Sequence, residues 1–367
     1  MKLLLLAITA FSANVFSQDV TFVNGDGALS IGTQSNRTAG IALIDIDADG
    51  DLDALVANGR HWAEQNFLYY NDGKGNFKSG QPIGEFLDAS YSIQGGDLDD
   101  DGFMDIAVVN DKVENKIYFG SANNTYKEFK VFGSAASPSR HLEITDIDKD
   151  GDLDLIISNR KAVNEICLND GKGNFEKVIK FGNKTDQTIQ TKLADINNDG
   201  HLDLITAERQ AKNKIYLNDG KQNYNRIIEF GDEEDETRSV EVADMNNDGL
   251  LDIAVGNLGS ENVIYYGNKE LTFSEKYEFK GKRMTSSIKV ADLNQDKILD
   301  VIEGNAGERN YVYLGTGNGT FIETGLREDL KDDTYDIDVG DLNNDGLLDI
   351  VEATSGEWNL YYFTWKK

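Results

Sequence analysis

The stretch DIDADGDLD, from Asp45 to Asp53, occurs with small changes seven times along the chain. The other copies are DLDDDGFMD from Asp97, DIDKDGDLD from Asp146, DINNDGHLD from Asp195, DMNNDGLLD from Asp244, DLNQDKILD from Asp292 and DLNNDGLLD from Asp341. Successive copies begin 52, 49, 49, 49, 48 and 49 residues apart. A fixed period of this length indicates one supersecondary unit stacked many times. The acidic composition of the loop indicates a hard cation bound by oxygen.

Each repeat arranges short apolar runs around this loop in the same order. One run, such as residues 239–243, precedes the loop, and another, such as residues 253–255, follows it. A third run opens on an asparagine in every repeat, at Asn66, Asn115, Asn164, Asn213, Asn262, Asn310 and Asn359. A turn such as residues 71–77 leads to a fourth run. Short β-branched and aromatic runs between Gly, Asn and Asp turns are typical of strands and hairpins. We therefore predict an all-β, seven-bladed β-propeller of four-stranded antiparallel blades.

The two ends of the chain suggest how such a ring closes. The last repeat stops at its third run, residues 359–363, while residues 23–29 resemble the turn that precedes a fourth run. We expect the N-terminal strand to complete the last blade. The repeats run without a linker, so residues 18–367 are expected to form one propeller domain.

Residues 1–17 are predicted to be a secretory signal peptide. Lys2 precedes an apolar run from Leu3 to Phe11, and small residues at Val15 and Ser17 offer a cleavage site. The run is too short to cross a bilayer, and no later segment of the sequence is apolar enough to do so. We expect a secreted protein, extracellular or periplasmic, that could be held at the cell surface.

The net charge limits the classes of partner, and the cysteine content limits how the fold can be stabilised. The formal net charge is −29, which disfavours nucleic acid and anionic membranes. The single cysteine, Cys167, excludes an internal disulfide and stands where the other repeats carry tyrosine. Cys167 is therefore expected to be a buried packing residue. Stability without disulfides points to bound cations as the substitute.

Loop positions 1, 3, 5 and 9 carry side-chain oxygens, and position 7 can offer its backbone carbonyl. Flexible, anionic oxygen sites favour Ca²⁺. The loop is not an EF-hand, because Val56 stands where that loop needs a glutamate. The expected ligands are Asp45, Asp47, Asp49, Asp51, Asp53, Asp97, Asp99, Asp101, Phe103, Asp105, Asp146, Asp148, Asp150, Asp152, Asp154, Asp195, Asn197, Asp199, His201, Asp203, Asp244, Asn246, Asp248, Leu250, Asp252, Asp341, Asn343, Asp345, Leu347 and Asp349.

The copies are not equivalent. The first three carry aspartate at all four side-chain positions, whereas the last four carry asparagine at position 3. The sixth also replaces the glycine at position 6 with Lys297, which brings a positive charge to the loop. We expect about six calcium sites with a mainly structural role, and a weak or empty site at Asp292, Asn294, Asp296 and Asp300.

The repeated D-x-[DN]-x-D-G-x-x-D loop in a unit of this length resembles the FG-GAP/VCBS repeats of the integrin α-subunit propeller and of secreted bacterial and fungal propellers. The resemblance covers nearly the whole chain after residue 17. It implies calcium in hairpin loops on one face and ligand binding on the other face or between blades. It implies no single activity, because such propellers include lectins, adhesion modules and polysaccharide lyases.

The face opposite the metal loops is formed by the connections between second and third strands and between blades. In an acidic chain, arginine, histidine and aromatic residues are concentrated in these connections, although ordinary surface charge would look the same. Arginine forks bind carboxylates or sulfates, and aromatic rings stack on sugars. The ligand-binding candidates are Arg60, His61, Trp62, Arg140, His141, Arg160, Arg238, Arg309 and Trp358.

Charges also alternate on the strand expected to line the central channel. Three residues before each metal loop stand Ala42, Gln94, Glu143, Lys192, Glu241, Lys289 and Asp338. From the third repeat to the seventh the sign alternates, so we predict a partial ring of ion pairs between neighbouring blades. Its expected role is to fix the register of the blades.

Three functions fit this sequence. The first is a non-enzymatic, monomeric calcium-binding module for carbohydrate or an extracellular protein, favoured because no blade carries a long insertion. The second is a lyase acting on a uronate polysaccharide, with Arg140 or Arg238 neutralising the carboxylate and His141, Tyr91 or Tyr335 as the base. The third is a structural component of a larger surface assembly.

Overall fold

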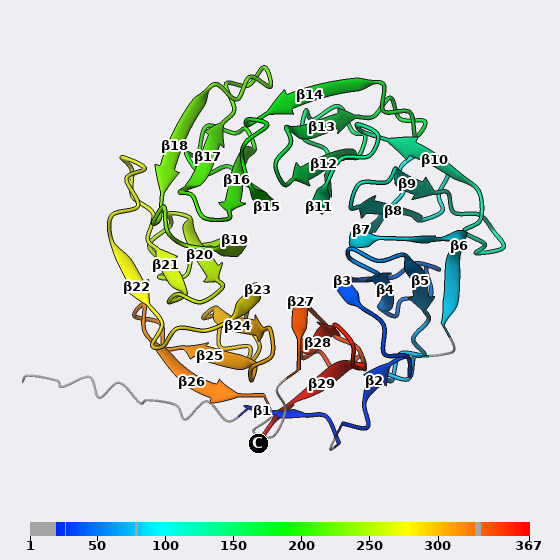
Figure 1. The fold of residues 1–367 in the computed structure, drawn as a ribbon. Helices are drawn as coiled ribbons and strands as arrows, with labels where there is room; N and C mark the ends of the chain where they lie inside the picture. Colours follow the sequence, from blue (N-terminus) through cyan, green and yellow to red (C-terminus); the bar gives the residue numbers. More distant parts are fainter. Residues whose placement is uncertain (1–19, 26, 78–79, 327–331) are drawn as a thin grey trace, which may run out of the picture.

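In the computed structural model, seven β-sheets stand side by side around a central channel (Figure 1). The structure describes residues 20–25, 27–77, 80–326 and 332–367. The proposed signal peptide, residues 1–17, lies outside the described residues. No helix long and apolar enough to cross a membrane occurs among the residues that are described. The blades are numbered one to seven in chain order, beginning with the sheet that contains β3.

Each blade contributes its first strand to the channel (Figure 1). These inner strands are β3 (Thr38–Ile44), β7 (Ser90–Gly96), β11 (Ser139–Thr145), β15 (Thr188–Ala194), β19 (Thr237–Ala243), β23 (Thr285–Ala291) and β27 (Thr334–Gly340). The second strands are buried along their whole length. They are β4 (Asp53–Asn58), β8 (Asp105–Asn110), β12 (Asp154–Asn159), β16 (Asp203–Glu208), β20 (Asp252–Asn257), β24 (Asp300–Asn305) and β28 (Asp349–Thr354).

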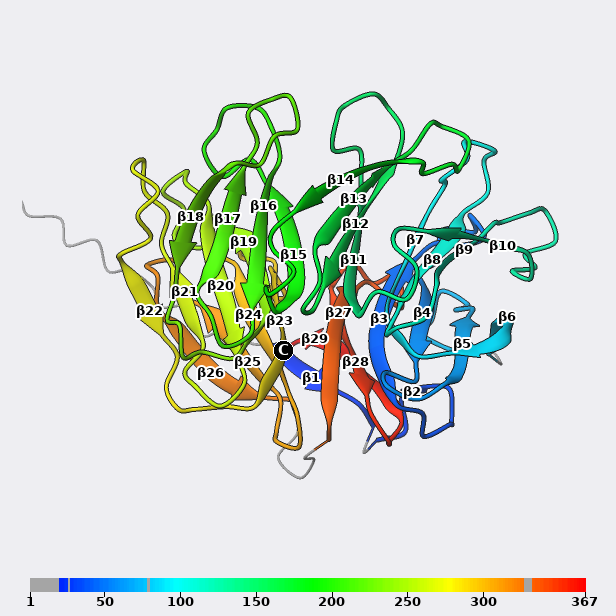
Figure 2. The ribbon, with the colours of Figure 1, turned by 45° about the horizontal axis from the view of Figure 1, so that its top comes forward.

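The third and fourth strands build the outer half of each blade (Figure 2). The third strands are β5 (Glu64–Tyr69), β9 (Asn115–Tyr118), β13 (Asn164–Leu168), β17 (Asn213–Leu217), β21 (Val263–Tyr265), β25 (Tyr311–Gly315) and β29 (Asn359–Lys366). The fourth strands of blades one to six are β6 (Gln81–Asp88), β10 (Phe129–Phe132), β14 (Lys177–Phe181), β18 (Arg226–Phe230), β22 (Lys276–Glu278) and β26 (Phe321–Gly325). All sheet pairings within the blades are antiparallel, which confirms the predicted fold.

The seventh blade is closed by the N-terminal segment, as predicted. Both β1 (Val20–Val23) and β2 (Ser30–Ile31) pair with β29, so the fourth strand is supplied in two pieces. Asn24 joins them to the blade, because its side-chain amide donates to the carbonyl oxygens of Leu29 at 2.9 Å and Tyr361 at 2.5 Å. The last strand runs to Lys366, beyond the 363 expected, because its extra residues pair with β1.

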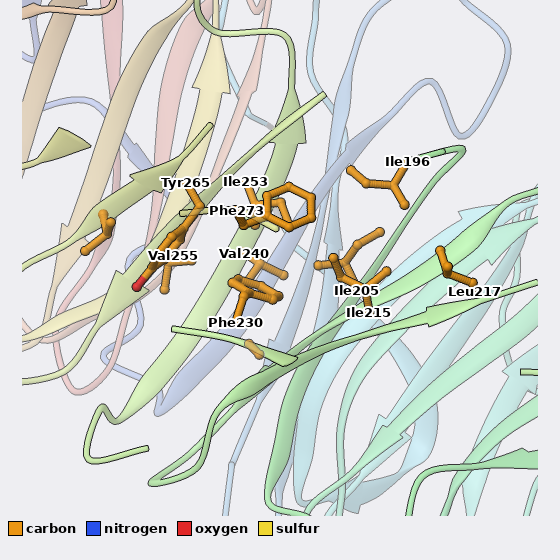
Figure 3. Packing of buried hydrophobic residues seen from close by; sticks show 12 residues of the cluster. Ile196, Ile205, Ile215, Leu217, Phe230, Val240, Ile253, Val255, Tyr265 and Phe273 are labelled. Carbon is orange, nitrogen blue, oxygen red and sulfur yellow. The ribbon is translucent and has the colours of Figure 1, made fainter. Parts of the chain in front are cut away.

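Apolar side chains fill the space between neighbouring blades rather than one central core. Between blades four and five, Ile205 and Ile215 pack with Val240 and Val255 (Figure 3). Cys167 belongs to the equivalent layer between blades two and three. Its side chain is fully buried, and burial raises the pKa of the thiol to about 12. The prediction that Cys167 is a packing residue is confirmed.

The repeated asparagine, which lies in or directly before each third strand, connects blades through buried hydrogen bonds. In the first blade the Asn66 amide donates to Ser90 Oγ of the next blade at 2.8 Å, and Ser90 Oγ donates to Asn110 at 2.8 Å. Asn66 also accepts from the backbone N–H of Asn58 at 2.8 Å. Equivalent contacts involve Asn115, Asn164, Asn262 and Asn310. The repeated asparagine thus sets the position of each blade relative to the next.

Candidate ligand cavity and metal-binding loops

The seven acidic loops share one hydrogen-bonded shape. In the first loop, the position-1 carboxylate of Asp45 accepts from the backbone N–H groups of Asp49 and Gly50 at 3.1 and 3.0 Å. Positions 4 and 6 have positive φ in every copy, as at Ala48 and Gly50. The chain therefore curls around its own carboxylates.

The position-9 aspartate ties each loop to its blade. Asp53 Oδ2 accepts from the N–H of Ile46 at 3.3 Å, and Oδ1 accepts from the N–H of Asn71 at 2.8 Å. Burial, with a smaller contribution from Asp47 and Asp49, raises the pKa of Asp53 to about 7. The aspartates at this position in the other loops show the same upward shift in pKa from burial.

The carboxylates of the first three loops could hold a metal ion. In each, three carboxylates have oxygen atoms within 4.8 Å of one another: Asp45, Asp47 and Asp53, then Asp97, Asp99 and Asp101, then Asp146, Asp148 and Asp154. One oxygen of Asp99 and one of Asp148 are buried without a hydrogen-bond partner. A buried carboxylate oxygen without a donor is costly unless a cation binds it.

In the fourth, fifth and seventh loops the position-3 asparagine donates a hydrogen bond to the position-5 aspartate. Asn197 donates to Asp199 Oδ2 at 2.9 Å. An aspartate at this position, as in the first three loops, could not donate this hydrogen bond. The sixth loop keeps the common shape even though Lys297 adopts a φ of 68°. A Cβ added at Gly249, the equivalent glycine of the fifth loop, would meet no atom within 4 Å. The cost of a side chain at this loop position is therefore the strain of a positive φ and not a steric clash.

The predicted ion pairs of the channel are present. Lys192 Nζ lies 2.6 Å from Glu143 Oε1 and 3.6 Å from Glu241 Oε1. Lys289 Nζ lies 3.7 Å from Glu241 Oε1 and 3.4 Å from Asp338 Oδ1. Because each lysine sits between two carboxylates, the pairs connect blades three to seven without a break.

At the equivalent inner-strand position the first blade carries the uncharged Ala42. Aspartates of the seventh blade contact the first blade through its backbone instead. Asp338 Oδ2 accepts from the N–H of Leu43 at 2.9 Å, and Asp336 Oδ2 accepts from the N–H of Ile41 at 3.2 Å. These contacts bring backbone donors of the first blade to carboxylates of the last.

A cavity of about 480 Å³ opens at the channel end where the inner strands begin. Every inner strand has a register shift after its first residue, so its second residue is a β-bulge. Bulges re-aim side chains, and here all seven bulge residues line the cavity. They are Ala39, Tyr91, Arg140, Ile189, Arg238, Ser286 and Tyr335.

Most of the sequence-predicted ligand residues line this cavity. They are Arg60, His61, Arg140, His141, Arg160 and Arg238, together with the lyase candidates Tyr91 and Tyr335. Three others lie outside it. Trp62 is 64% exposed and stacks with Arg37, Trp358 is 44% exposed, and Arg309 lies against the ring of Tyr311.

Several cavity residues were missed as site candidates by sequence reasoning, notably Ser92, Gln190, Ser239, Ser287 and Asp336. A signal for them exists, because a serine or threonine stands seven residues before every metal loop. That residue begins the inner strand, and in blades two to seven the two residues after it line the cavity.

Asp111 organises one wall of the cavity. Its carboxylate accepts from Arg140 Nη1 at 2.8 Å and lies 2.7 Å from His61 Nδ1. Burial works against ionisation, but Arg140 and His61 outweigh it and hold the pKa of Asp111 below its usual value. The hydroxyl of Tyr91 lies 2.9 Å from His61 Nε2, and Arg140 stacks on the Tyr91 ring at 4.1 Å.

His141 lies between the cavity and the ion pairs of the channel. Its Nε2 is 3.4 Å from Gln190 Nε2 and 3.7 Å from Glu143 Oε1. Burial, followed by the positive charges of Lys192 and Lys289, lowers the pKa of His141 well below its ordinary value. The imidazole is therefore neutral at pH 7.

Comparison with known proteins supports the repeat assignment. The family model of the FG-GAP-like repeat matches residues 45–108, 97–157, 146–206, 195–255, 244–303 and 296–352. No curated protein sequence matches the chain.

Solved structures match the chain in fold. BBS1N in complex with ARL6DN, soaked with mercury, aligns with a TM-score of 0.64 and 13% identity over 93% of this chain and 96% of that one. The same complex soaked with lead gives 0.63 and 12% over 94% and 97%. Raptor from Chaetomium thermophilum gives 0.59 and 10%, covering 95% of this chain but 29% of its own length.

Proposed function

The chain belongs to the FG-GAP-like repeat family, and from that premise we propose a secreted, calcium-stabilised propeller that binds a carbohydrate or an extracellular protein without catalysing a reaction. The observation that carries this proposal is the cavity at the end of the channel, where bulges of seven successive blades direct side chains inward. Such a concave site with a few convergent polar groups is the usual place for a ligand. Secretion rests on residues 1–17 of the sequence.

Calcium is proposed for the acidic loops because their donor set consists of oxygen. In the first loop Asp45, Asp47, Asp49 and Asp53 would hold the ion through side chains, and Asp51 through its backbone carbonyl. A dication there would offset the mutual repulsion of the carboxylates, and in the next loops it would supply the buried oxygens of Asp99 and Asp148 with a partner. The ions would support the scaffold from the end of the blades opposite the cavity.

A protein ligand is supported by analogy only. BBS1N, a propeller of similar fold, was crystallised in complex with ARL6DN. A TM-score of 0.64 at 13% identity supports a shared fold and not a shared partner. Carbohydrate and extracellular protein are therefore both part of the proposal.

The lyase alternative has one observation in its favour. Tyr91, Arg140, His141, Arg238 and Tyr335 come from different blades and line the same cavity. A lyase needs a group that neutralises the substrate carboxylate and a base that removes a proton. The neutral imidazole of His141 could accept a proton, but it is only partly accessible, with a side chain 16% exposed.

The test uses the full chain after residue 17, loaded with calcium and compared with the chelated protein. A glycan array and a pull-down from extracellular protein should give a ligand that depends on calcium. Ultraviolet absorbance of the unsaturated product during incubation with uronate polysaccharides should stay flat. A steady rise in that absorbance would favour the lyase, and the absence of any bound glycan or protein would overturn the proposed binding function.

A further inference from the structure

Four of the five arginines that line the cavity lie on one side of the ring, and the fifth, Arg60, comes from blade one. Arg140 and Arg160 come from blade three, Arg209 from blade four and Arg238 from blade five. Burial lowers the pKa of Arg160 and of Arg238, and neighbouring guanidinium groups add to the shift in both cases. This wall of the cavity therefore carries an excess of positive charge in an otherwise strongly acidic chain.

The carboxylates on this wall compensate only part of that charge. Asp111 forms an ion pair with Arg140. Glu236 accepts hydrogen bonds from two arginines, from Arg209 Nη2 to its Oε2 at 3.3 Å and from Arg238 to its Oε1. Among the described residues, no ion pair joins Arg160 to a carboxylate. The Arg140 side chain is only 3% exposed, yet its Nη2 has no hydrogen-bond partner. Arg160 thus keeps its donors for an external anion, while the buried guanidinium of Arg140 adds positive charge to the same wall.

The aromatic rings of the cavity are already engaged by arginine. Arg60 stacks on Tyr335 at 3.6 Å, and Arg140 stacks on Tyr91 at 4.1 Å. The exposed tryptophans, Trp62 and Trp358, do not line the cavity. The cavity therefore favours recognition of an anion by guanidinium groups over stacking of an aromatic ring on a neutral sugar.

Uncharged polar groups flank the arginine wall. Ser92 lies on blade two and Ser286 on blade six, and both line the cavity. Neither hydroxyl makes a hydrogen bond to another residue in the described part of the chain, so both can serve a ligand hydroxyl. The volume of about 480 Å³ lies within the range of small-ligand pockets.

We propose that the cavity binds a uronic acid residue of a saccharide, with its carboxylate on Arg160 and its hydroxyls on Ser92 and Ser286. The inference rests on the proposed binding function and names the ligand class for it. Arg160 supplies a planar fork that matches a carboxylate, and the uncompensated charge of the wall selects an anion over a neutral sugar.

The experiment is isothermal titration of the calcium-loaded chain with a trimer of galacturonate and with the matching neutral trimer of galactose. The two probes share the ring and differ in the carboxylate. We expect binding of the acidic trimer that weakens as salt is raised, and binding of the neutral trimer that is roughly tenfold weaker or absent. This comparison needs no variant, so it decides the matter even if a substitution disturbs folding.

A variant then locates the carboxylate. Arg160→Gln keeps the backbone contacts of Arg160 and removes the guanidinium, and it should weaken the acidic trimer roughly tenfold without changing the neutral one. The matched control is Arg226→Gln, because Arg226 is exposed on the outer strand β18. The control should bind the acidic trimer as the wild type does.

Two further outcomes separate this inference from the proposed function. Equal binding of the acidic and neutral trimers, or unchanged binding by Arg160→Gln, overturns the uronate inference and leaves a carbohydrate-binding propeller. Binding of an acidic peptide but of neither trimer also overturns it and assigns the cavity to a protein ligand. Binding of no probe overturns the inference, and the pull-down then decides the proposed function by itself.

Discussion

Lys192 Nζ lies 2.6 Å from Glu143 Oε1 across the boundary between blades three and four. The same ammonium group reaches Glu241 on blade five at 3.6 Å, so one side chain connects three blades. Burial opposes the charge of Lys192, but its two carboxylate neighbours outweigh that effect and raise its pKa. The charged layer thus fixes the spacing of the inner strands directly beneath the cavity.

Lys192→Met should destabilise the propeller by about 3 kcal/mol, because it leaves the carboxylates of Glu143 and Glu241 close together and uncompensated in the channel. Chemical denaturation of the calcium-loaded protein measures the change. Lys276→Met is the control, since the Lys276–Glu278 pair is exposed and should contribute at most about 0.5 kcal/mol. Equal effects of the two substitutions would contradict a structural role for the channel pairs.

Lys297→Gly should strengthen the sixth metal loop. The lysine adopts a φ of 68°, which costs a non-glycine residue about 1 kcal/mol, and its charge opposes a bound cation. We expect a gain in stability that persists in chelator and one additional calcium ion per chain by titration. An unchanged number of bound ions would show that Lys297 does not limit this site.

Asn262→Ala should cost about 2 kcal/mol or more, because it leaves buried groups unsatisfied. Its amide donates to Thr285 Oγ1 at 2.8 Å and Glu303 Oε1 at 2.5 Å, and it accepts from the N–H of Asn257 at 2.7 Å. The loss is measured by thermal and chemical unfolding. Asn268→Ala, in an exposed turn, is the control and should change stability little.

Acid should destabilise the protein through His141. Its pKa is lowered in the folded state, so below about pH 6.5 the unfolded chain binds a proton that the folded chain does not. The contribution of His141 to the free energy of unfolding therefore falls as the pH drops through its unfolded pKa. His141 faces Glu143, Gln190, Lys192 and Lys289, and their pairing is kept in His141→Gln. The variant should have a shallower slope of stability between about pH 6.5 and 5, and an identical slope would contradict this account.

Removal of calcium should lower the melting temperature of the whole propeller. If free calcium is about ten times the dissociation constant, each occupied site adds about 1.4 kcal/mol, so several sites together match the net stability of a domain. Calorimetry with and without chelator measures the effect, and magnesium in place of calcium is the control. An unchanged melting temperature would remove the structural role proposed for these loops.

The fold was predictable because every repeat carries the same sequence pattern. Seven acidic loops at a nearly constant period and the asparagine repeated in every unit identify the blade. One blade can bury its apolar faces only against others. The alternation from Glu143 to Asp338 also predicted the channel pairs, since the inner strands place equivalent residues at one level. The division of the closing strand into β1 and β2 was not predictable, because it depends on pairing between the two ends of the chain.

The cavity was only partly predictable for a related reason. Sequence reasoning brought together Arg60, Arg140, Arg160 and Arg238 as one face, but it also included Trp62, Trp358 and Arg309, which lie outside the cavity. Loop membership gives the face of the propeller on which a residue lies. It does not give the distance from the axis, which depends on how each bulge and loop directs its side chain.

The sequence by itself determined the number of blades, the position of the acidic loops and the sign of the charges along the channel, because these repeat with the local chain. Only the tertiary structure decided which charges remain uncompensated. Arg140 and Asp111 stand on different blades, as do Arg238 and Arg209, which share Glu236. Arg160 keeps its guanidinium for a ligand because the ring places no carboxylate within ion-pairing distance of it among the described residues.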